Sequence, residues 1–335
     1  MRKASIVIGD ECYRNNHLFN LNDPVINRDN CLYPFSLLKD RLLKNGYELA
    51  TSDINSPSTS DIVFYNEMPK QLPPPSEYEK SYLLLFESEL IRPDNWDFKK
   101  HQAFHKVFTW NDDLIDNVKY FKINFSFMLP ERISKNLSKK EKLCTLIAGN
   151  KKVNHPLELY SKRLEAIRWF EENHLDQFDL YGMGWDKYRF SGPKLIRALN
   201  KVKPLTRLLA PYFPSYRGKV EQKKPTLEKY KFAICFENAR DIPGYITEKI
   251  FDCFVAGCIP VYWGANNIDC HIPPSCYIDM RKFENYEALY RFLINMTDYE
   301  YKAYLNEIDS FLSSEKANFF SADYFAQTLI GEALK

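Results

Sequence analysis

The strongest constraint on the fold comes from two nearly continuous apolar runs, "KFAICFE" at 231–237 and "IPVYWG" at 259–264. Such runs are typical of strands buried on both faces, as in a parallel sheet covered by helices. The segment between them predicts a helix from about Thr247 to Ala256, with Gly257 as its C-terminal cap. This part of the chain is therefore expected to form βα units of an α/β domain.

The same alternation of strand and helix patterns runs along the rest of the sequence. Strand candidates in the first part are "KASIVIG", "SDIVFYNE", "SYLLLFESE" and "HKVFTWNDD", and the pattern restarts at "KLCTLIAGN" after a polar stretch. A chain of 335 residues is long enough for two domains. We expect an N-terminal domain at 1–130, a linker at 131–142, a second domain at 143–312 and a C-terminal helix at 313–335. That helix could pack back on the N-terminal domain.

Composition narrows the classes of partner. The 46 Lys and Arg residues are balanced by 44 Asp and Glu residues, which gives no reason to expect a nucleic acid. No apolar run approaches the roughly 20 residues of a membrane-spanning helix. The start, "MRKASIVIGDECYRNN", has no signal-peptide core, and eight scattered cysteines without C-x-x-C spacing are typical of reduced thiols. We expect a cytoplasmic protein, with peripheral attachment to the inner face of the cell membrane left open.

Polar residues interrupt the apolar pattern in "ENARDIPGYITEK" at 237–249. Glu237 and Asn238 come at the carboxyl end of the predicted strand, which is the edge where open α/β sheets bind ligands. The next helix starts near Thr247, so its first amides point to the same edge. Lys249 lies in that first turn, where a cation is unfavourable unless an anion compensates it. The pattern predicts a phosphate or diphosphate ligand; the alternative is a set of solvated loop and first-turn residues.

Nucleotide and metal motifs of the usual kinds are missing from the sequence. There is no G-x-x-x-x-G-K-[ST], and "YGMGWDK" at 181–187 lacks the third glycine of a dinucleotide fingerprint. There is no D-x-D triplet for a metal-bridged sugar nucleotide either. His101 and His105 have i, i+4 spacing, but such a pair without H-E-x-x-H is more typical of exposed helix residues than of zinc ligands. No metal site is predicted.

The block "KFAICFENARDIPGYITEKIFDCFVAGCIPVYWGA" resembles the signature of the α1,3/4-fucosyltransferases, glycosyltransferase family 10, in which F-E-N, Y-[IV]-T-E-K and P-V-x-x-G recur in this order. The similarity extends to "NHPLELYSKRLEAIRWF" and, more weakly, to "SDIVFYN" and "LLLFESELIRPDNW". The pattern is similar to that of bacterial, lipopolysaccharide-type members. It implies an α/β fold of the GT-B type, in which two Rossmann-like domains face each other across a cleft.

The resemblance also implies a reaction. Members of the family move L-fucose from GDP-β-L-fucose, held mainly by the C-terminal domain, to a sugar hydroxyl, usually O3 of N-acetylglucosamine or glucose, with inversion. No cofactor is required, and Mn²⁺ is at most stimulatory. The expected acceptor is an oligosaccharide or lipid-linked glycan of the Lewis or O-antigen type, bound by the N-terminal domain. Two alternatives stay open: a transferase that uses another GDP-deoxysugar, and a non-catalytic glycan- or nucleotide-binding protein on the same scaffold.

Residues that carry the reaction follow from the resemblance one by one. Glu87 in "LLLFESE" matches the general base that takes the proton of the acceptor hydroxyl, and Glu89, two residues on, is a competitor on the same strand face. Both are expected to contact the acceptor. Arg163 and Lys249 match the residues that neutralise the departing diphosphate.

Other positions match the part of the family pattern that holds the donor. Asn238, Tyr245 and Glu248 are expected to contact nucleotide, phosphate or fucose, and Glu248 could stabilise oxocarbenium-like charge. Tyr216 and Lys219, in "PSYRGKVEQK", either touch the donor or belong to an exposed basic loop.

One basic segment lies outside the family motif. Residues 192–224 contain nine Lys or Arg residues and one Glu, interleaved with leucine and isoleucine. This pattern is typical of an amphipathic segment at a membrane surface, and it predicts contact with anionic lipid or with a lipid-linked glycan. The alternative is a solvated helix over the donor-binding domain.

Overall fold

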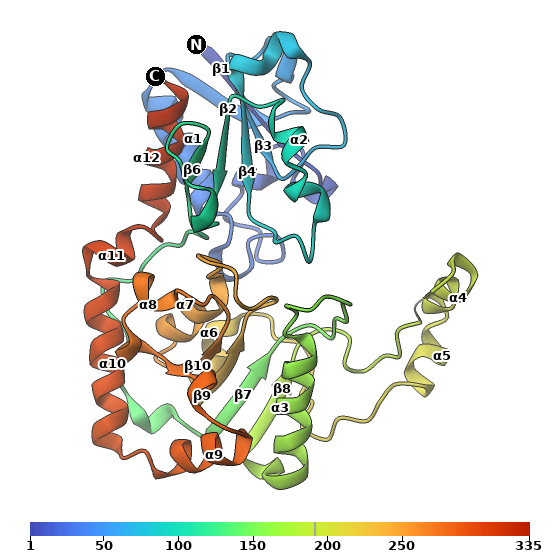
Figure 1. Cartoon of the computed structure of the whole chain (residues 1–335), viewed down its shortest axis with the longest axis vertical. Coiled ribbons are helices and arrows are strands. Elements are labelled where there is room, and N and C mark those ends of the chain that lie inside the picture. The colour runs from blue at the N-terminus through green and yellow to red at the C-terminus, as the bar shows by residue number, and fades with distance from the viewer. Residues whose placement is uncertain (191) are drawn as a thin grey trace.

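The computed structural model describes residues 1–190 and 192–335, and these build one parallel sheet in each half of the chain (Figure 1). The N-terminal sheet has six strands in the order β2-β1-β3-β4-β5-β6. They are β1 (Arg2–Ile8), β2 (Tyr47–Thr51), β3 (Ile62–Asn66), β4 (Ser81–Leu85), β5 (Lys106–Thr109) and β6 (Tyr120–Lys122). All of these strands pair in parallel.

The C-terminal sheet has five parallel strands in the order β11-β10-β9-β7-β8. They are β7 (Lys142–Ile147), β8 (Phe178–Tyr181), β9 (Tyr230–Phe236), β10 (Ile259–Trp263) and β11 (Ile278–Asp279). The chain leaves β7 on one side to form β8 and returns on the other side to form β9. Loops that follow β7 and β9 therefore diverge, which creates a crevice at the carboxyl ends of these two strands.

Helices cover both sheets, as Figure 1 shows. Those of the first half are α1 (Tyr33–Lys44) and α2 (Phe98–His101). Those of the second half are α3 (Tyr160–Asn173), α4 (Lys194–Ala198), α5 (Lys203–Leu208), α6 (Lys223–Leu227), α7 (Glu248–Val255), α8 (Ile268–His271), α9 (Tyr286–Asn295), α10 (Asp298–Leu312), α11 (Glu315–Asn318) and α12 (Ala322–Ala333).

The apolar runs form the strands that they predict. All five residues of β4 are buried, and so is every residue of β9 except Lys231, as expected for strands covered on both faces. The helix predicted between β9 and β10 is confirmed as α7, and Gly257 follows it with a φ of +58°. A left-handed residue at this place ends a helix, and glycine adopts it without a Cβ clash.

The C-terminal residues differ from the single helix expected over 313–335. They form α11 and α12, because the two parts pack against different domains. Phe320, just after α11, is buried in the core of the C-terminal domain, whereas Phe325 and Leu329 of α12 are buried in the core of the N-terminal domain. Figure 1 shows α12 beside α1 in the upper domain. The chain thus crosses between the domains twice, once in each direction.

The two domains also touch next to the crevice. The ring of Trp110, which follows β5, lies 4.7 Å from the ring of Tyr245 in the β9–α7 loop. Asp112 accepts hydrogen bonds from Asn267 at 2.8 Å and pairs with His271 at 2.7 Å. Because Asp112 belongs to the N-terminal domain and its partners to the C-terminal one, these contacts fix the position of one domain against the other.

Two segments differ from the sequence-based picture. His101 is buried and lies between the hydroxyl of Tyr120 at 3.0 Å and the carbonyl of Asn95 at 2.7 Å, so it is a core histidine and not an exposed one. The basic segment 192–224 is not one amphipathic helix. Its first part, α4 and α5, extends away from the body (Figure 1), while the part from Phe213 onward packs back on the C-terminal domain.

Candidate active site

A cavity of about 340 Å³ opens at the carboxyl ends of β7, β8 and β9, in the crevice where the strand order reverses. We call it the first cavity. The chain just after β8 passes close to the chain just after β7 there: Gly182 has a φ of +131°, and a Cβ atom on it would lie 1.9 Å from the carbonyl oxygen of Ala148. Glycine is therefore required at this position for the wall of the first cavity to form.

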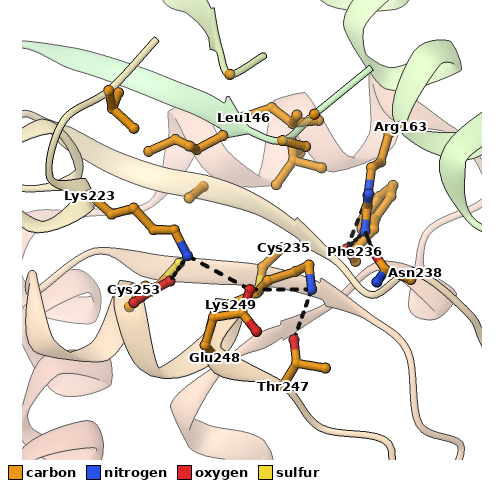
Figure 2. Close-up of a pocket in the computed structure, with 18 of the residues that line it drawn as sticks. Leu146, Arg163, Lys223, Cys235, Phe236, Asn238, Thr247, Glu248, Lys249 and Cys253 are labelled. Atoms are coloured by element: carbon orange, nitrogen blue, oxygen red, sulfur yellow. Dashed lines mark hydrogen bonds and ion pairs between the residues drawn. The ribbon is translucent and has the colours of Figure 1, made fainter. Parts of the chain in front are cut away.

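Lys249 is held in the first cavity by protein groups. Its Nζ donates to Glu237 at 3.1 Å and to the hydroxyl of Thr247 at 2.8 Å, and Figure 2 shows the bond to Thr247. Glu237 is fully buried and accepts two more bonds from Thr247, one from its amide at 2.8 Å and one from its hydroxyl at 2.7 Å. Although burial favours the neutral amine, Glu237 and then Glu248 raise the pKa of Lys249 above its ordinary value. Lys249 is therefore a fixed cation.

Glu248 lies between two lysines, as Figure 2 shows. Its carboxylate is 3.7 Å from Lys249 and 3.7 Å from Lys223, and 41% of its side chain stays open to the cavity. Burial opposes ionisation, but the two cations lower the pKa of Glu248 to about 2. Glu248 therefore carries a negative charge at neutral pH at the place where the first cavity opens.

Arg163, on α3, is buried and aimed at the carboxyl end of β9. Its Nε and Nη2 donate to the carbonyl of Phe236 at 3.2 and 2.6 Å, and Nη2 also donates to Asn238 at 3.0 Å (Figure 2). Burial lowers the pKa of Arg163, but a guanidinium keeps its proton at physiological pH. Asn238 in turn donates to the hydroxyl of Tyr245 at 3.3 Å. The three side chains form one wall of the first cavity.

Glu87 comes from the other domain and faces the same space. It follows β4, lines the first cavity and also lines a second cavity of about 490 Å³ on the N-terminal side. The second cavity has an aromatic wall, including Phe35, Phe86 and Phe125. Glu248 also lines both cavities, so the two carboxylates lie where the cavities meet. Burial raises the pKa of Glu87, which makes it a stronger base than an exposed carboxylate.

Three of the candidate residues are not placed inside the first cavity. Two of them do not line it, and the third lies at its rim. Glu89 does not share a strand face with Glu87, because β4 ends at Leu85; Glu89 is exposed and is not among the residues that line the first or second cavity. Tyr216 does not line the first cavity either, and its hydroxyl donates to the carbonyl of Gly182 at 2.9 Å. Lys219 does line the first cavity but is exposed at its rim.

Several features of the site were not predicted from the sequence. Glu237 was expected at the sheet edge, but its bond to Lys249 joins positions twelve apart and has no local signal. Lys223 was counted with the basic segment, although it is paired with Asp252 at 2.6 Å and lines both cavities. Glu67, which lines the second cavity beside Glu87, carries no motif at all.

Within residues 1–190 and 192–335, no group of three or more His, Cys, Asp or Glu side chains is placed to hold a metal ion. In the same part of the chain, none of the helices is both long and apolar enough to span a bilayer.

Comparisons with known proteins agree with this geometry. The family model "Glycosyltransferase family 10 (fucosyltransferase) C-term" matches residues 137–320. The chain is 31% identical over 154 residues to the α-(1,3)-fucosyltransferase FucT of Helicobacter pylori, which covers 39% of this chain and 31% of that protein. It is 33% identical over 72 residues to an α-(1,4)-fucosyltransferase of Arabidopsis thaliana, covering 22% of this chain and 18% of that protein. The chain thus matches about a third or less of the length of these curated relatives.

Solved structures show the fold. An α1,3-fucosyltransferase crystallised with GDP-fucose is similar over 100% of this chain and 90% of its own, with a TM-score of 0.53 and 13% identity. WaaG, a glycosyltransferase of lipopolysaccharide biosynthesis, is similar over 98% of this chain and 100% of its own, with a TM-score of 0.54 and 10% identity. The resemblance noted in the sequence is confirmed: the chain has the GT-B fold and belongs to glycosyltransferase family 10, the fucosyltransferase family.

Proposed function

We propose that the protein is an inverting fucosyltransferase that moves L-fucose from GDP-β-L-fucose to a hydroxyl of a glycan acceptor. The observation that carries this proposal is the meeting of the two cavities at Glu87 and Glu248. A transfer between two substrates needs two binding spaces that join at the reacting atoms. Family membership and the shared fold of the α1,3-fucosyltransferase crystallised with GDP-fucose support the same donor.

The first cavity would hold the GDP part of the donor. Arg163 and Lys249 are fixed cations on its wall, and the first amides of α7 point into the same space. As the bond between the anomeric carbon and the diphosphate oxygen breaks, these groups stabilise the charge that develops on GDP. They are positioned before the substrate arrives, so little reorganisation is needed. In this mechanism the two side chains replace a metal ion.

The second cavity would hold the acceptor. Aromatic faces such as Phe35, Phe86 and Phe125 suit the apolar face of a pyranose, and the carboxylates at the cavity junction suit its hydroxyls. Glu87 takes the proton of the acceptor hydroxyl while the oxygen forms a bond to the anomeric carbon of fucose and GDP leaves on the opposite side. Glu248 stabilises the positive charge that develops on the fucose ring. We propose O3 of N-acetylglucosamine or glucose, in a cell-surface glycan precursor of the Lewis or O-antigen type, as the acceptor position.

The experiment is GDP release by the purified protein with GDP-fucose and an array of glycan acceptors, in the presence of EDTA. We expect acceptor-dependent release and a fucosylated product of α configuration. Glu87→Gln should lower kcat about 100-fold or more while GDP binding, measured by calorimetry, is kept. Faster release with another GDP-deoxysugar would correct the donor. GDP binding without turnover on any acceptor would instead support a non-catalytic protein.

We also propose that the enzyme works on the inner face of the cell membrane, held there by the arm, defined as α4, α5 and the residues between them (194–208). Leu195 and Leu208 on the arm are 87% and 82% exposed, which is unusual for leucine. Between positions 187 and 220 the sequence has no Asp or Glu, whereas the arm carries Lys194, Arg197, Lys201, Lys203 and Arg207. Apolar and basic side chains exposed together fit an anionic lipid surface.

Co-sedimentation with vesicles tests the membrane proposal. The wild-type protein should bind phosphatidylcholine vesicles that contain phosphatidylserine, more weakly at high salt, and should not bind pure phosphatidylcholine. Replacing Lys194, Arg197, Lys201 and Lys203 by Glu should abolish binding. Replacing four exposed lysines outside the arm, Lys44, Lys70, Lys99 and Lys302, should have a much smaller effect. Equal binding by the arm variant would rule out the arm as the lipid contact.

A further inference from the structure

Glu67 sits at the end of β3 in a conformation that only a surrounding structure can impose. Its φ is +71°, a left-handed value that non-glycine residues adopt rarely and at a cost. The backbone is held in this state by the amide of Glu67, which donates to the carbonyl of Leu84 on β4 at 2.9 Å. Strained residues of this kind cluster at functional sites. The consequence here is that the Glu67 carboxyl turns toward the neighbouring strand end, where Glu87 begins.

The carboxyl of Glu67 holds the backbone of the proposed base. Its Oε1 accepts a hydrogen bond from the amide of Glu87 at 2.9 Å and from the amide of Phe86 at 3.3 Å. Its Oε2 accepts a bond from Nδ2 of Asn95. All three partners are donors, so the pattern suits a carboxylate and leaves no acceptor for a carboxyl proton.

The carbonyl of Glu87, in the next peptide unit, is held by a connected set of groups. The carbonyl of Glu87 accepts bonds from Nδ2 of Asn95 at 3.2 Å and from the indole of Trp96 at 3.1 Å. Asn95 is fully buried, and its Oδ1 accepts a bond from the amide of Met68 at 2.9 Å. Its amide orientation is therefore fixed, with both Glu67 and Glu87 on its donor side. The backbone of Glu87 is therefore held at its amide by Glu67 and at its carbonyl by Asn95 and Trp96, and moving it would break these hydrogen bonds.

We propose that Glu67 is a positioning residue, whose ionised carboxylate fixes the direction in which Glu87 points at the junction of the two cavities. The inference rests on the proposed role of Glu87 as the base. Glu67 and Glu87 both line the second cavity, so the network that sets the base also borders the space for the acceptor. Glu67 itself is not assigned a bond to substrate.

The charge of Glu67 is sensitive to pH. Burial raises the pKa of Glu67 to about 7, and the negative charge of nearby Glu87 adds to this shift. The hydrogen bonds from the amide of Glu87 and from Asn95, and the positive charge of Arg92, act in the opposite direction. The form that accepts three hydrogen bonds is therefore lost as the pH falls below about 7. We expect kcat of the wild-type enzyme to fall on the acid side with a midpoint near this value, because Glu67 then gains a proton and no longer holds the backbone of Glu87 as a carboxylate.

Glu67→Gln tests the proposal because it keeps the shape of the side chain and removes the titration. The side-chain amide of Gln has only one oxygen. It therefore cannot accept hydrogen bonds both from the amides of Phe86 and Glu87 and from Asn95, and one of these interactions is lost. We expect kcat to fall 10- to 100-fold, the range for losing a group that orients a catalytic residue, with the KM for GDP-fucose within about threefold of wild type. The acid limb should move to lower pH, since only Glu87 still titrates. Amide hydrogen exchange over residues 81–90 should become faster.

The controls separate positioning from folding. Glu48→Gln, an exposed carboxylate on β2 of the same sheet, should change neither kcat nor the pH profile. Glu67→Asp, which keeps the charge and tolerates a left-handed backbone, serves if Glu67→Gln does not fold, and its acid limb should stay near that of the wild type. A folded Glu67→Gln enzyme with wild-type kcat and an unmoved acid limb would overturn the proposal. Full activity of Glu87→Gln would also overturn it, because Glu87 would then not be the base that Glu67 is proposed to position.

Discussion

At the scale of single residues, the site is a set of charges that are compensated before any substrate is bound. The sequence predicts an anion beside Lys249, and the protein supplies one itself, the carboxylate of Glu237 at 3.1 Å. The same holds for Lys223, which pairs with Asp252 at 2.6 Å. An incoming diphosphate therefore meets cations that are already oriented, which reduces the reorganisation that binding requires.

Glu237→Gln should reveal how much this pairing matters. Removing Glu237 takes away the nearer anion and leaves Lys249 with Glu248 alone, at 3.7 Å, so we expect a loss of about 3 kcal/mol in the free energy of unfolding. Saturating GDP should raise the melting temperature more than in the wild type, because the diphosphate then supplies the missing anion. Thermal denaturation with and without GDP measures both effects. Glu165→Gln, which breaks the exposed Lys162–Glu165 pair, is the control and should change stability by less than about 1 kcal/mol. Equal stability of the wild type and Glu237→Gln would show that Glu237 does not compensate the charge of Lys249.

Lys219 should act at longer range, because it is exposed at the rim of the first cavity. We expect Lys219→Met to weaken GDP binding about 3- to 10-fold at low ionic strength, and this difference should shrink in about 0.5 M salt as the charge is screened. Calorimetry at two salt concentrations measures it. Lys224→Met changes an exposed lysine five positions away that is not among the residues lining the first cavity, and should have little effect. A difference that persists at high salt would point to direct contact with GDP instead.

At the scale of elements, the sequence predicted those strands and helices that leave a clear apolar pattern, and few of the other features. The strands β4 and β9 and the helix α7 were predictable because burial on both faces leaves a continuous apolar run. The polar residues after β9 were correctly expected at the carboxyl edge of its sheet, where open α/β sheets bind ligands. The exact end of β4 was not predictable, and this decides that Glu87 faces the cavities and Glu89 does not.

Interactions between distant segments could not be predicted. Glu67 and Glu87 are brought together by the pairing of β3 with β4, and no spacing in the sequence marks it. In the basic segment, lysines of the arm and Lys223 look alike in the sequence, yet Lys223 is enclosed at the cavity junction. The composition of a segment does not say which of its residues fold back on the domain.

Gly182→Ala tests how closely β7 and β8 must approach. A Cβ atom would lie 1.9 Å from the Ala148 carbonyl oxygen and would also strain a backbone φ of +131°. We expect a loss of at least about 2 kcal/mol in stability, together with weaker GDP binding, because the wall of the first cavity must move. Chemical denaturation and calorimetry measure the two effects. Gly331→Ala on α12 is the matched control: nothing lies within 4 Å of the added Cβ, so the change should be neutral or stabilise by up to about 1 kcal/mol. Tight GDP binding by a stable Gly182→Ala protein would show that the wall is dispensable.

At the scale of the whole molecule, the reaction requires that the two domains keep Glu87 of one opposite Lys249 and Glu248 of the other. Helix α12 packs against α1 in the N-terminal domain and so ties the end of the chain to that domain. The alignment of Glu87 with Lys249 and Glu248 depends on the contacts between the domains beside the cavities. Trp110 packs on Tyr245, and Asp112 reaches across to Asn267 and His271. These groups lie on the loops after β5 and β9, and on α8 and the residue before it, close to the residues that line the first cavity. The catalytic alignment and the stability of the domain contact should therefore vary together.

Asp112→Asn tests this link through pH. Burial opposes ionisation, but His271, Lys122 and Asn267 lower the pKa of Asp112 well below its usual range. A group with a lowered pKa contributes stability that is present above its unfolded pKa, near about 4, and lost as the pH falls toward the folded value. We expect Asp112→Asn to lose about 2 kcal/mol at pH 7, and the gap to the wild type should close as the pH falls below about 4. Urea unfolding across this range measures it, and kcat should fall with stability. As a control, Asp113→Asn at the exposed neighbouring position should change neither the free energy of unfolding nor kcat. A stability difference between Asp112→Asn and the wild type that stays constant with pH would show that the charge of Asp112 does not hold the domains together.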